Sequence, residues 1–591
     1  MIGRSFQVQK DIVRRKVQSA LTNVHLSVDI WTSPNNHLLL AVCAHFVDSQ
    51  DNLTKALLAL RPVSGHSGAE QWNALFPVLE EYGIIRKLGA IVADNSTTND
   101  TLCSSIHDHL AQNEAVQWDP IQQRIRCQGH TINLAVKDFL FKDIISLEEV
   151  ESYERIEVSE DSEEDSDSDS DSEELELEVR SLDCFEEDID QGEVFRAMGI
   201  LGKLHNVVVH FRSSPNRTKE FVSLVGRRVP LDNSTRWNSW YQMLSVALEH
   251  ESGIDAYIKK NLDTLEKDCI SAQDWKDLHE ICEFLKPFHR ATLDTQGANS
   301  TLGQVLFTMD VLIKHMESSL VLTLLLAIKS KADIVRQESF TAPKASKPSK
   351  PSRSSRSSKP SKASASDGSS RLNEDLAARV ENAWVKFDEY YSRTDNSPLY
   401  AAALILNPNY RLGYIHAFWK TEWIDSILPK VRQLWKTYCE SEACLSSLQR
   451  LKGSSIVSND IVNKPSQRIP QVPDKYDQIV NEMKRKVVRS VSQDEYEDYS
   501  SETPFEVEVS SLEWWCQESQ TTRWPRLSLF AREVLSIPAM SDEPERVFSG
   551  GRRTISWERM QLGVSNLERI ECMKSWHRSS ILEEDVLSSI D

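Results

Sequence analysis

Two aspartates in the first hundred residues occur where they could support metal-dependent chemistry. Asp29 lies within a β-rich run at residues 25–31, and Asp94 ends an almost continuous apolar run at residues 88–94. If these runs are neighbouring strands, the two carboxylates meet at one edge of a sheet. Converging carboxylates repel one another unless a divalent cation is present, and Mg²⁺ is the hard ion that oxygen ligands favour. Two such ions about 3.5–4 Å apart would promote phosphodiester cleavage. For either aspartate alone, a turn-capping role is the plain alternative.

The elements around these aspartates follow the order β-β-β-α-β-α-β-α, which is typical of an RNase H-like fold. The first and fourth strands of that fold are neighbours, as the chemistry requires. The pattern predicts a helical lead-in at 1–24, strands at 25–31, 37–47, 55–63, 88–94 and 123–127, and helices at 68–82, 101–112 and 131–141. We therefore expect an α/β RNase H-like catalytic core with a mixed five-stranded sheet.

Two segments of biased composition interrupt this pattern. Residues 146–191 hold a run of Ser, Asp and Glu, and residues 342–371 are rich in Ser, Pro and Lys, so neither can bury a core. We expect both to be disordered linkers. The remaining boundaries place the first part of the core at 25–145, core helices at 192–239, a large mostly α-helical insertion at 240–510, the C-terminal part of the core at 511–580 and a tail at 581–591.

The composition limits which functions and which cellular compartments are expected for the chain. The formal net charge is −21, which argues against nucleic-acid binding, but twelve of the acidic residues lie between Glu160 and Glu178. The ten cysteines include no pair at C-x-x-C spacing, which favours a reduced intracellular compartment. The apolar runs fall far short of the roughly 18 residues that suggest a membrane span, so no membrane partner is expected.

Seven motifs, found in the same order along nearly the whole chain, resemble those of the hAT-superfamily DNA transposases of fungal type. They are LSVDIWTS at 26–33, GHSG at 65–68, IVADNSTTN at 91–99, CQGH at 127–130, STRWNS at 234–239, LNPNYRL at 406–412, and a block from WW at 514 to PAMSDEPERVFS ending at 549. The order of the motifs makes this resemblance far more specific than any one of them.

The resemblance implies a catalytic triad and a reaction. Asp29 and Asp94 match the two aspartates of the family's DDE triad, and Glu545 matches the glutamate of its S-x-x-x-E-R-x-F-S box. The three would bind Mg²⁺ or Mn²⁺ and would cleave and join transposon-end DNA. A carboxylate near a helix start can also serve only to stabilise the helix dipole, by about 0.3–1 kcal/mol.

Two further motifs imply contacts with DNA. Cys127 and His130 match the family's C-x-x-H element, whose histidine is expected near the scissile phosphate, and Arg236 and Trp237 match an RW pair whose indole stacks on an extruded base. Cys127 and His130 could instead be half of a zinc site, although no second ligand pair lies at finger spacing. Trp237 could be a simple core residue.

The C-terminal region resembles the hAT dimerisation region. The resemblance implies a homodimer or a higher homo-oligomer, with DNA as the other partner and the nucleus as the location. The residues expected in the interface are Phe548, Leu567, Ile570, Met573 and Trp576. Packing of the same helix onto the chain's own sheet is the alternative, and both can hold.

One expected module of the family has no counterpart in this sequence. Family members commonly carry an N-terminal BED-type zinc finger that reads transposon ends, and here only 28 residues precede Asp29. The alternative function is therefore a domesticated or truncated transposase that dimerises and binds chromatin without catalysis, and a third is a general nuclease of the same fold. The remaining basic candidates for DNA contact are Arg124, Arg126, Arg227, Arg228, Arg552, Arg553 and the cluster at 484–489.

Overall fold

The computed structural model describes most of the chain as two compact units. The described residues are 2–114, 116–141, 195–232, 237–297, 300–322, 368–441, 494–555 and 559–582. Unit 1 comprises Met1–Thr131, Thr292–Val311 and Glu389–Asp591, and unit 2 comprises Ile132–Ala291 and Leu312–Asp388. The segment 146–191 and most of 342–371 lie outside the described residues. Of the described residues, 389–441 and 494–510 fall in unit 1 with the sheet, and 195–232 and 237–239 fall in unit 2.

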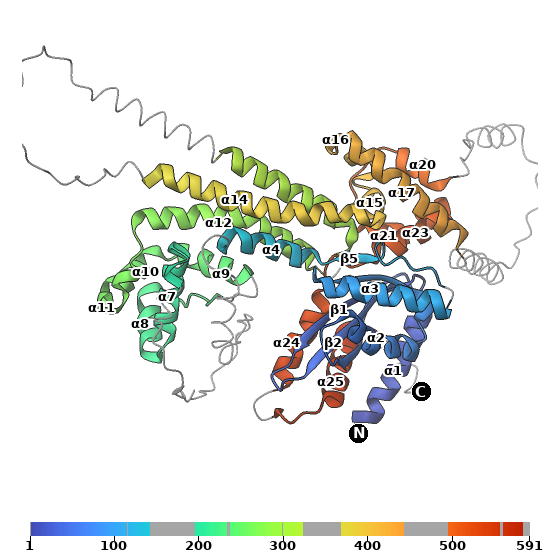
Figure 1. The fold of residues 1–591 in the computed structure, drawn as a ribbon, viewed down its shortest axis with the longest axis horizontal. Helices are drawn as coiled ribbons and strands as arrows, with labels where there is room; N and C mark the ends of the chain where they lie inside the picture. Colours follow the sequence, from blue (N-terminus) through green and yellow to red (C-terminus); the bar gives the residue numbers. More distant parts are fainter. Residues whose placement is uncertain are drawn as a thin grey trace, which may run out of the picture. The chain divides into compact units, whose positions relative to one another are not determined.

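Unit 1 is built on a mixed five-stranded sheet with the strand order β3-β2-β1-β4-β5 (Figure 1). β1 runs antiparallel to β2 and parallel to β4, so the prediction that the first and fourth strands are neighbours is confirmed. The turns before and after β2 contain Asn36 and Asp51 with φ of 59° and 67°, a conformation that short polar side chains tolerate. The strands are β1 (Val24–Thr32), β2 (Leu38–Val47), β3 (Leu53–Pro62), β4 (Leu88–Ala93) and β5 (Arg124–Arg126).

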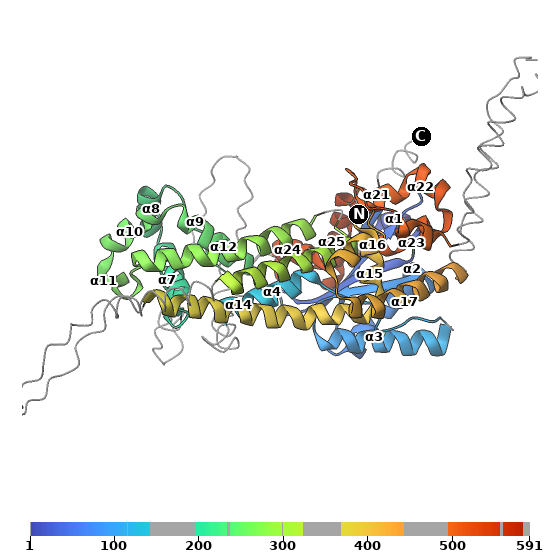
Figure 2. The same ribbon diagram turned by 90° about the horizontal axis from the view of Figure 1, so that it is seen from above.

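Helices cover both faces of this sheet (Figures 1 and 2). α2 (Gly68–Tyr82) and α3 (Thr97–His109) lie on one face, and α24 (Asp542–Thr554) and α25 (Val564–Arg578) lie on the other. Because successive strand residues point to opposite faces, each strand can supply apolar side chains to both layers. α1 (Ile2–Gln18) packs against α2 and α25, and the ring of Phe6 stacks on Trp576 with centroids 5.4 Å apart.

A further group of helices completes unit 1 and leads the chain back to the sheet. α15 is buried along its whole length, which matches its continuous apolar sequence. α23 is joined to β1 by His25, whose Nε2 lies 3.0 Å from the carbonyl oxygen of Glu533. The helices are α15 (Pro398–Ile405), α16 (Arg411–Phe418), α17 (Thr421–Glu440), α20 (Glu495–Ser501), α21 (Ser511–Cys516), α22 (Glu518–Arg523) and α23 (Pro525–Leu535).

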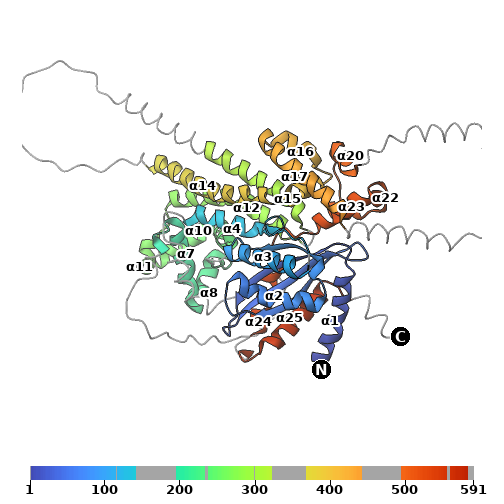
Figure 3. The ribbon, with the colours of Figure 1, turned by 45° about the vertical axis from the view of Figure 1, so that its right-hand side comes forward.

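The described part of unit 2 is helical. α7, α8 and α10 pack against one another (Figure 3), with the rings of Phe211 and Phe221 stacked 3.8 Å apart in their core. The helices are α7 (Ile200–Arg212), α8 (Pro215–Val225), α9 (Trp237–Leu248), α10 (Glu251–Lys260), α11 (Leu262–Leu265) and most of α12 (Ala272–Thr295) and α14 (Gly368–Arg393); α4 (Gln128–Phe141) enters this unit from unit 1. Across both units, the described helices include none that is long and apolar enough to span a membrane.

Candidate functional site

The register of β1 and β4 brings the two predicted aspartates side by side. Leu26 is paired with Ile91 and Ser27 with Val92 in this parallel ladder. Continuing the same register by two residues sets Asp29 level with Asp94, which follows directly on the last residue of β4. Both side chains are only partly exposed, so the edge of the sheet where they meet is accessible to solvent but largely enclosed.

Two other carboxylates, those of Asp94 and Glu545, act electrostatically on Asp29. The pKa of Asp29 is raised to about 7, mainly by burial, then by the Asp94 carboxylate and, least, by Glu545, while the N–H of Ile30 lowers it. That N–H donates to Asp29 Oδ1 over 2.8 Å. Like charges that approach in this way favour protonation of one member or the binding of a cation.

Glu545 reaches the edge because α24 packs along β1. Phe548 stacks on Trp31 with ring centroids 5.5 Å apart, and a Cβ on Gly551 would lie 3.2 Å from the Trp31 ring. Glu545 precedes Phe548 by one helical turn, and Asp29 precedes Trp31 by two strand residues, so each pair shares one face. The same packing that buries Phe548 therefore directs Glu545 toward Asp29.

Ion pairs fix the first turn of α24 over the sheet. Lys55 of β3 lies 3.6 Å from Glu543, and both side chains are largely buried. Arg546 contacts Asp542 and Glu543 within the helix, each at 2.8 Å, and also donates to the carbonyl oxygen of Gln296 over 2.9 Å. These contacts hold the helix start, and with it Glu545, against two other segments of unit 1.

Asp94 is positioned by the turn that follows β4. Its Oδ1 accepts hydrogen bonds from the N–H of Ser96 at 2.9 Å and from Asn99 Nδ2 at 2.6 Å. Arg124, 6% exposed, donates to the carbonyl oxygens of Ala93 and Asp94. The role of Asn99 escaped sequence analysis, although its place in a run of N-capping residues was a signal.

The two arginines of β5 are held by ion pairs within unit 1. Arg124 and Arg126 both pair with Asp100, at 3.4 and 3.2 Å. Of the other basic candidates, the side chains of Arg227, Arg228, Arg552 and Arg553 are exposed, and the cluster at 484–489 lies outside the described residues.

Cys127 of the C-x-x-H element acts as a buried cap in unit 1. Its Sγ accepts a hydrogen bond from the N–H of Ser541 over 3.4 Å, and the N–H of Gln128 donates to the carbonyl oxygen of Ala539. Burial raises the pKa of the Cys127 thiol to about 11, so the sulfur is protonated at neutral pH.

The other half of the element, His130, lies within the first turn of α4 and is partly exposed. Between it and Cys127, Gly129 permits a close approach, because a Cβ there would lie 2.0 Å from the terminal methyl of Met540. The element thus braces the loop that leads into α24 and Glu545.

Among the described residues, no three His, Cys, Asp or Glu side chains form a group spaced to hold a metal ion.

The RW pair belongs to unit 2. Arg236 lies outside the described residues, and Trp237 begins α9 with a side chain only 3% exposed. The backbone N–H of Trp237 is held by Asn133 Oδ1 at 3.2 Å. In this state the indole is packed as a core residue and presents no open face for a base.

The residues expected in a dimer interface largely pack within the chain. Phe548, Leu567 and Trp576 are at most 9% exposed and belong to the core around the sheet, and Trp576 Nε1 donates to the carbonyl oxygen of Leu57 over 2.9 Å. Ile570 and Met573 are partly exposed. Intramolecular packing, the alternative left open above, therefore accounts for three of the five.

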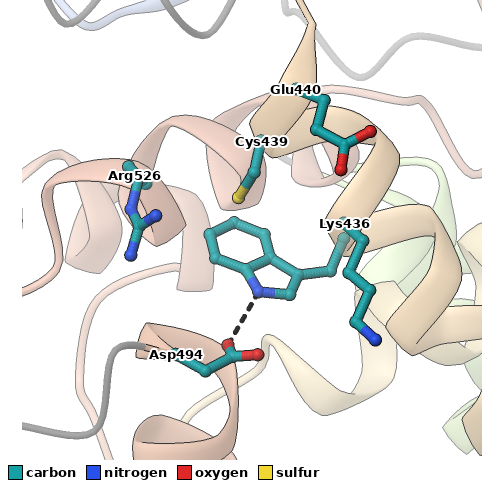
Figure 4. Close-up of a pocket in the computed structure, with 6 residues that line it drawn as sticks. Lys436, Cys439, Glu440, Asp494 and Arg526 are labelled. Carbon is teal, nitrogen blue, oxygen red and sulfur yellow. Dashed lines mark hydrogen bonds between the residues drawn. The ribbon is translucent and has the colours of Figure 1, made fainter.

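A shallow pocket of about 160 Å³ lies in another part of unit 1, lined by Trp435, Lys436, Cys439, Glu440, Asp494 and Arg526 (Figure 4). Its central contact is a hydrogen bond of 2.8 Å from Trp435 Nε1 to Asp494 Oδ1. None of the predicted site residues lines it. The pocket is therefore separate from the carboxylate site.

Three family models match separate parts of the chain. Residues 27–119 match the ZBED1 RNase-like domain, and residues 187–284 match the ZBED1 RNase-like helical domain. Residues 495–577 match the hAT family C-terminal dimerisation region. The first match includes Asp29 and Asp94, and the last includes Glu545, so the three carboxylates come from matched segments at opposite ends of the chain.

Curated relatives extend the similarity over almost the whole sequence. The chain is 20% identical to "Putative AC transposase" of Zea mays, over 97% of this chain and 59% of the relative. It is 19% identical to "Zinc finger BED domain-containing protein RICESLEEPER 2" of Oryza sativa subsp. japonica, over 97% of this chain and 67% of the relative. It is 27% identical to "Putative transcriptional regulator tpeD" of Talaromyces stipitatus, over 53% of this chain and 34% of the relative.

The chain thus spans less than two thirds of the length of the AC transposase and of tpeD. The predicted resemblance is nevertheless confirmed by the matched domains and by the 97% coverage. Over 97% of its length the chain is thus similar to hAT transposases and to BED zinc finger proteins, and parts of it match ZBED1 RNase-like domains and the hAT dimerisation region.

Proposed function

We propose that this chain is the catalytic part of a hAT-type DNA transposase with an RNase H-like core, which acts in the nucleus as a homodimer or higher homo-oligomer. Its reaction is the metal-dependent cleavage of transposon-end DNA and the joining of those ends to target DNA. Asp29, Asp94 and Glu545 are the acidic residues of the site. The match to the hAT dimerisation region supports self-association.

The observation that carries this proposal is the electrostatic coupling of the three carboxylates. Both Asp94 and Glu545 raise the pKa of Asp29, although Glu545 is more than 450 residues away in sequence. A chain that needed only stability would not place three acids at one solvent-accessible edge, because their repulsion costs free energy. The strand order supports the same reading, since it is that of an RNase H-like sheet.

The donor set suits Mg²⁺ or Mn²⁺. All three side chains offer carboxylate oxygens, which are the ligands that these hard cations prefer. In the described residues the three are not spaced as a metal-binding group, so a bound ion would have to draw them together. When bound, the metal ions would activate the attacking oxygen and stabilise the leaving oxygen of a phosphodiester. The protein's own part is to hold Asp94 by Ser96 and Asn99, and Glu545 by the packing of Phe548.

Exposed arginines on the same helix support binding of DNA beside the site. Arg552 follows Glu545 by seven residues, or about two helical turns, and so lies on the same side of α24. Arg552 and Arg553 are both exposed near the end of the helix. They are suited to contact phosphates on either side of a scissile bond.

The test is a nicking and strand-transfer assay with Mg²⁺ or Mn²⁺, using the full chain and oligonucleotides that carry the element's terminal repeats. Asp94→Asn keeps the acceptor for Asn99 but removes the charge, so cleavage should fall at least about 100-fold, a loss of about 3 kcal/mol of transition-state stabilisation. Asp108→Asn is the matched control, because Asp108 is exposed on the adjacent α3. Its activity should equal that of the wild type.

Two other outcomes would change the assignment. If the wild type is as inert as Asp94→Asn even when fused to a DNA-binding domain, the chain is a domesticated relative that binds DNA without cutting it. If the wild type cuts arbitrary DNA equally well, and Trp237→Ala leaves that cutting unchanged, it is a general nuclease.

A further inference from the structure

The first turn of α4 is bonded both to the end of β4 and to the loop that leads into α24. The N–H of Cys127, which directly precedes α4, donates to the carbonyl oxygen of Ala93 over 2.9 Å, and Ala93 directly precedes Asp94. The N–H of Gln128 donates to the carbonyl oxygen of Ala539 over 3.2 Å, three residues before α24 begins. The main chain of this turn is therefore bonded to the segments that carry two of the three site carboxylates.

A buried side-chain hydrogen bond adds to the link with β4. Asn95, the residue after Asp94, is 7% exposed, and its Nδ2 donates to Thr131 Oγ1 over 3.2 Å. Thr131 is 2% exposed, and its hydroxyl donates to the carbonyl oxygen of Cys127 over 3.3 Å. Asn95 and Thr131 thus tie the turn that holds Asp94 to the first turn of α4.

Stability alone does not account for the amide side chain at position 95. Asn95 Oδ1 is buried and, among the described residues, has no hydrogen-bond partner. A buried polar atom without a partner lowers the stability of a fold, so an apolar side chain would be favoured here if packing were the only requirement. A side chain that costs stability and yet holds a site residue's turn is expected of a residue that positions a functional neighbour.

A close steric contact completes the link with α24. A Cβ on Gly129 would lie 2.0 Å from the terminal methyl of Met540, so the loop approaches α4 more closely than an alanine there would allow. Cys127 Sγ accepts the N–H of Ser541 over 3.4 Å, and Ser541 directly precedes α24. These contacts fix where α24 begins, and Glu545 lies in the first turn of that helix.

We propose that the first turn of α4 is a positioning element for the metal site. Asn95 and Thr131 place Asp94, and Gly129 and Met540 place the start of α24. The turn keeps Asp94 and the helix that carries Glu545 within reach of the same ion, so that both carboxylates can close on it when it binds. This inference rests on the proposed function, because it takes these two carboxylates as ligands of one metal centre.

A helix is suited to this task because its hydrogen-bonded turns are stiffer than a loop. α4 has 14 residues, and its first turn is anchored in the core of unit 1. Asp94 and Glu545 are more than 450 residues apart in sequence, so only tertiary contacts can set their separation. A displacement of about 1 Å in such a site can lower activity about 100-fold.

The first test measures Mn²⁺ binding to the full chain by electron paramagnetic resonance of the free ion. Thr131→Val keeps the shape of the side chain but removes the acceptor for Asn95, so the dissociation constant should rise about tenfold, as for other residues behind metal ligands. Asn95→Ala should act in the same way, and the double variant should be no weaker than either single variant, because all three lack the same bond. Thr131→Ser retains the hydroxyl and should bind like the wild type, as should the control Asn113→Ala at an exposed position.

The contact with the loop before α24 is tested by a pair of substitutions. Gly129→Ala should raise the dissociation constant of Mn²⁺ about tenfold, because the added methyl displaces Met540 and the start of α24. Met540→Ala in the same chain makes room for that methyl, so the double variant should regain most of the lost affinity. A variant that had only lost stability would not recover when a second buried side chain is truncated.

Hydrogen–deuterium exchange without metal reports on the same positions directly. Thr131→Val should speed exchange in the peptide 94–100, and Gly129→Ala should do so in the peptide 540–548, each by at least about threefold, because local contacts protect these amides. Thr131→Ser, and Gly129→Ala combined with Met540→Ala, should exchange like the wild type.

Two results in the Mn²⁺ experiments would overturn the inference. Equal binding by Thr131→Ser and Thr131→Val would show that the hydroxyl is not the link, and failure of Met540→Ala to rescue Gly129→Ala would show general damage to the fold. If the wild type binds Mn²⁺ no better than Asp94→Asn, the proposed function fails, and exchange alone decides the positioning inference. Unchanged exchange in both peptides would then refute it, and faster exchange that the rescuing variants reverse would uphold it.

Discussion

Two aspartates of unit 1 occupy environments that could hardly differ more. Asp310 accepts three hydrogen bonds, from the hydroxyls of Tyr391 and Tyr414 at 2.6 and 2.8 Å and from Trp419 Nε1 at 3.0 Å. Asp29 accepts one from its own neighbour's N–H and faces two other carboxylates. The first carboxylate is satisfied by donors and ties segments together, whereas the second is held in a repulsive setting that a cation would relieve.

The contrast separates residues that stabilise this fold from residues whose charged form lowers its stability. Burial, followed by the Asp310 charge, raises the pKa of Tyr391 well above its usual range, so that phenol remains a donor at any physiological pH. At the carboxylate edge, by contrast, ionisation of Asp29 opposes folding. Neutralising the two aspartates should therefore change stability in opposite directions.

The largest loss of stability is expected at Asp310. Asp310→Ala leaves two tyrosine hydroxyls and one indole N–H without their acceptor, so we expect a loss of about 3 kcal/mol or more in the free energy of unfolding. Urea denaturation followed by tryptophan fluorescence measures it. Asp425→Ala, at an exposed position of α17, is the control and should change stability by less than about 0.5 kcal/mol. A loss as small as the control's would show that the three hydrogen bonds contribute little.

Asp29→Asn should stabilise the chain, and only at high pH. The pKa of Asp29 is raised in the folded state from 3.8 to about 7, so the wild type loses stability as pH rises from about 4 to 7 and its aspartate ionises. Asparagine cannot ionise, so the gain should be near zero at pH 4 and up to about 4 kcal/mol at pH 8, at about 1.4 kcal/mol per pKa unit. Denaturation curves without divalent metal at both pH values measure it. An equal gain at both would trace the effect to packing and not to charge.

The smallest effect is the response to metal. At pH 8, millimolar Mn²⁺ should raise the melting temperature of the wild type by about 2 °C, because a ligand that binds only the folded state stabilises it. Asp29→Asn and Asp94→Asn should respond less, and Asp108→Asn should respond like the wild type. Differential scanning fluorimetry reports the shifts. An equal response in all four proteins would place the bound metal elsewhere.

Much of the sheet could be predicted from the sequence because its signals are local. β-rich runs, turn residues and an apolar strand located the strands to within a few residues, and the pairing of β1 with β4 followed from their order. The motif resemblance pointed to Glu545. Its approach to Asp29 depends on Phe548 and Trp31 stacking across more than 500 residues of sequence, which no local pattern encodes.

The roles of several residues depend on the neighbours that surround their side chains in the folded chain, and a sequence motif does not specify those neighbours. Arg124 was a candidate for DNA contact, but its side chain is buried and donates to the carbonyl oxygen of Ala93 at the end of β4. Cys127 matched a C-x-x-H element, and in the folded chain its buried sulfur accepts the N–H of Ser541. Trp237 matched a base-stacking motif, and its side chain is buried in unit 2.

The sequence by itself determined which residues could be chemically active, since residue type, strand order and motif spacing are written along the chain. It identified Asp29, Asp94 and Glu545 and the family to which they point. Only the tertiary structure decided which charged and polar groups are satisfied and which repel one another. The physical reason is that the pKa of a carboxylate depends on burial and on charges within a few ångströms, and those neighbours come from β1, the end of β4 and α24.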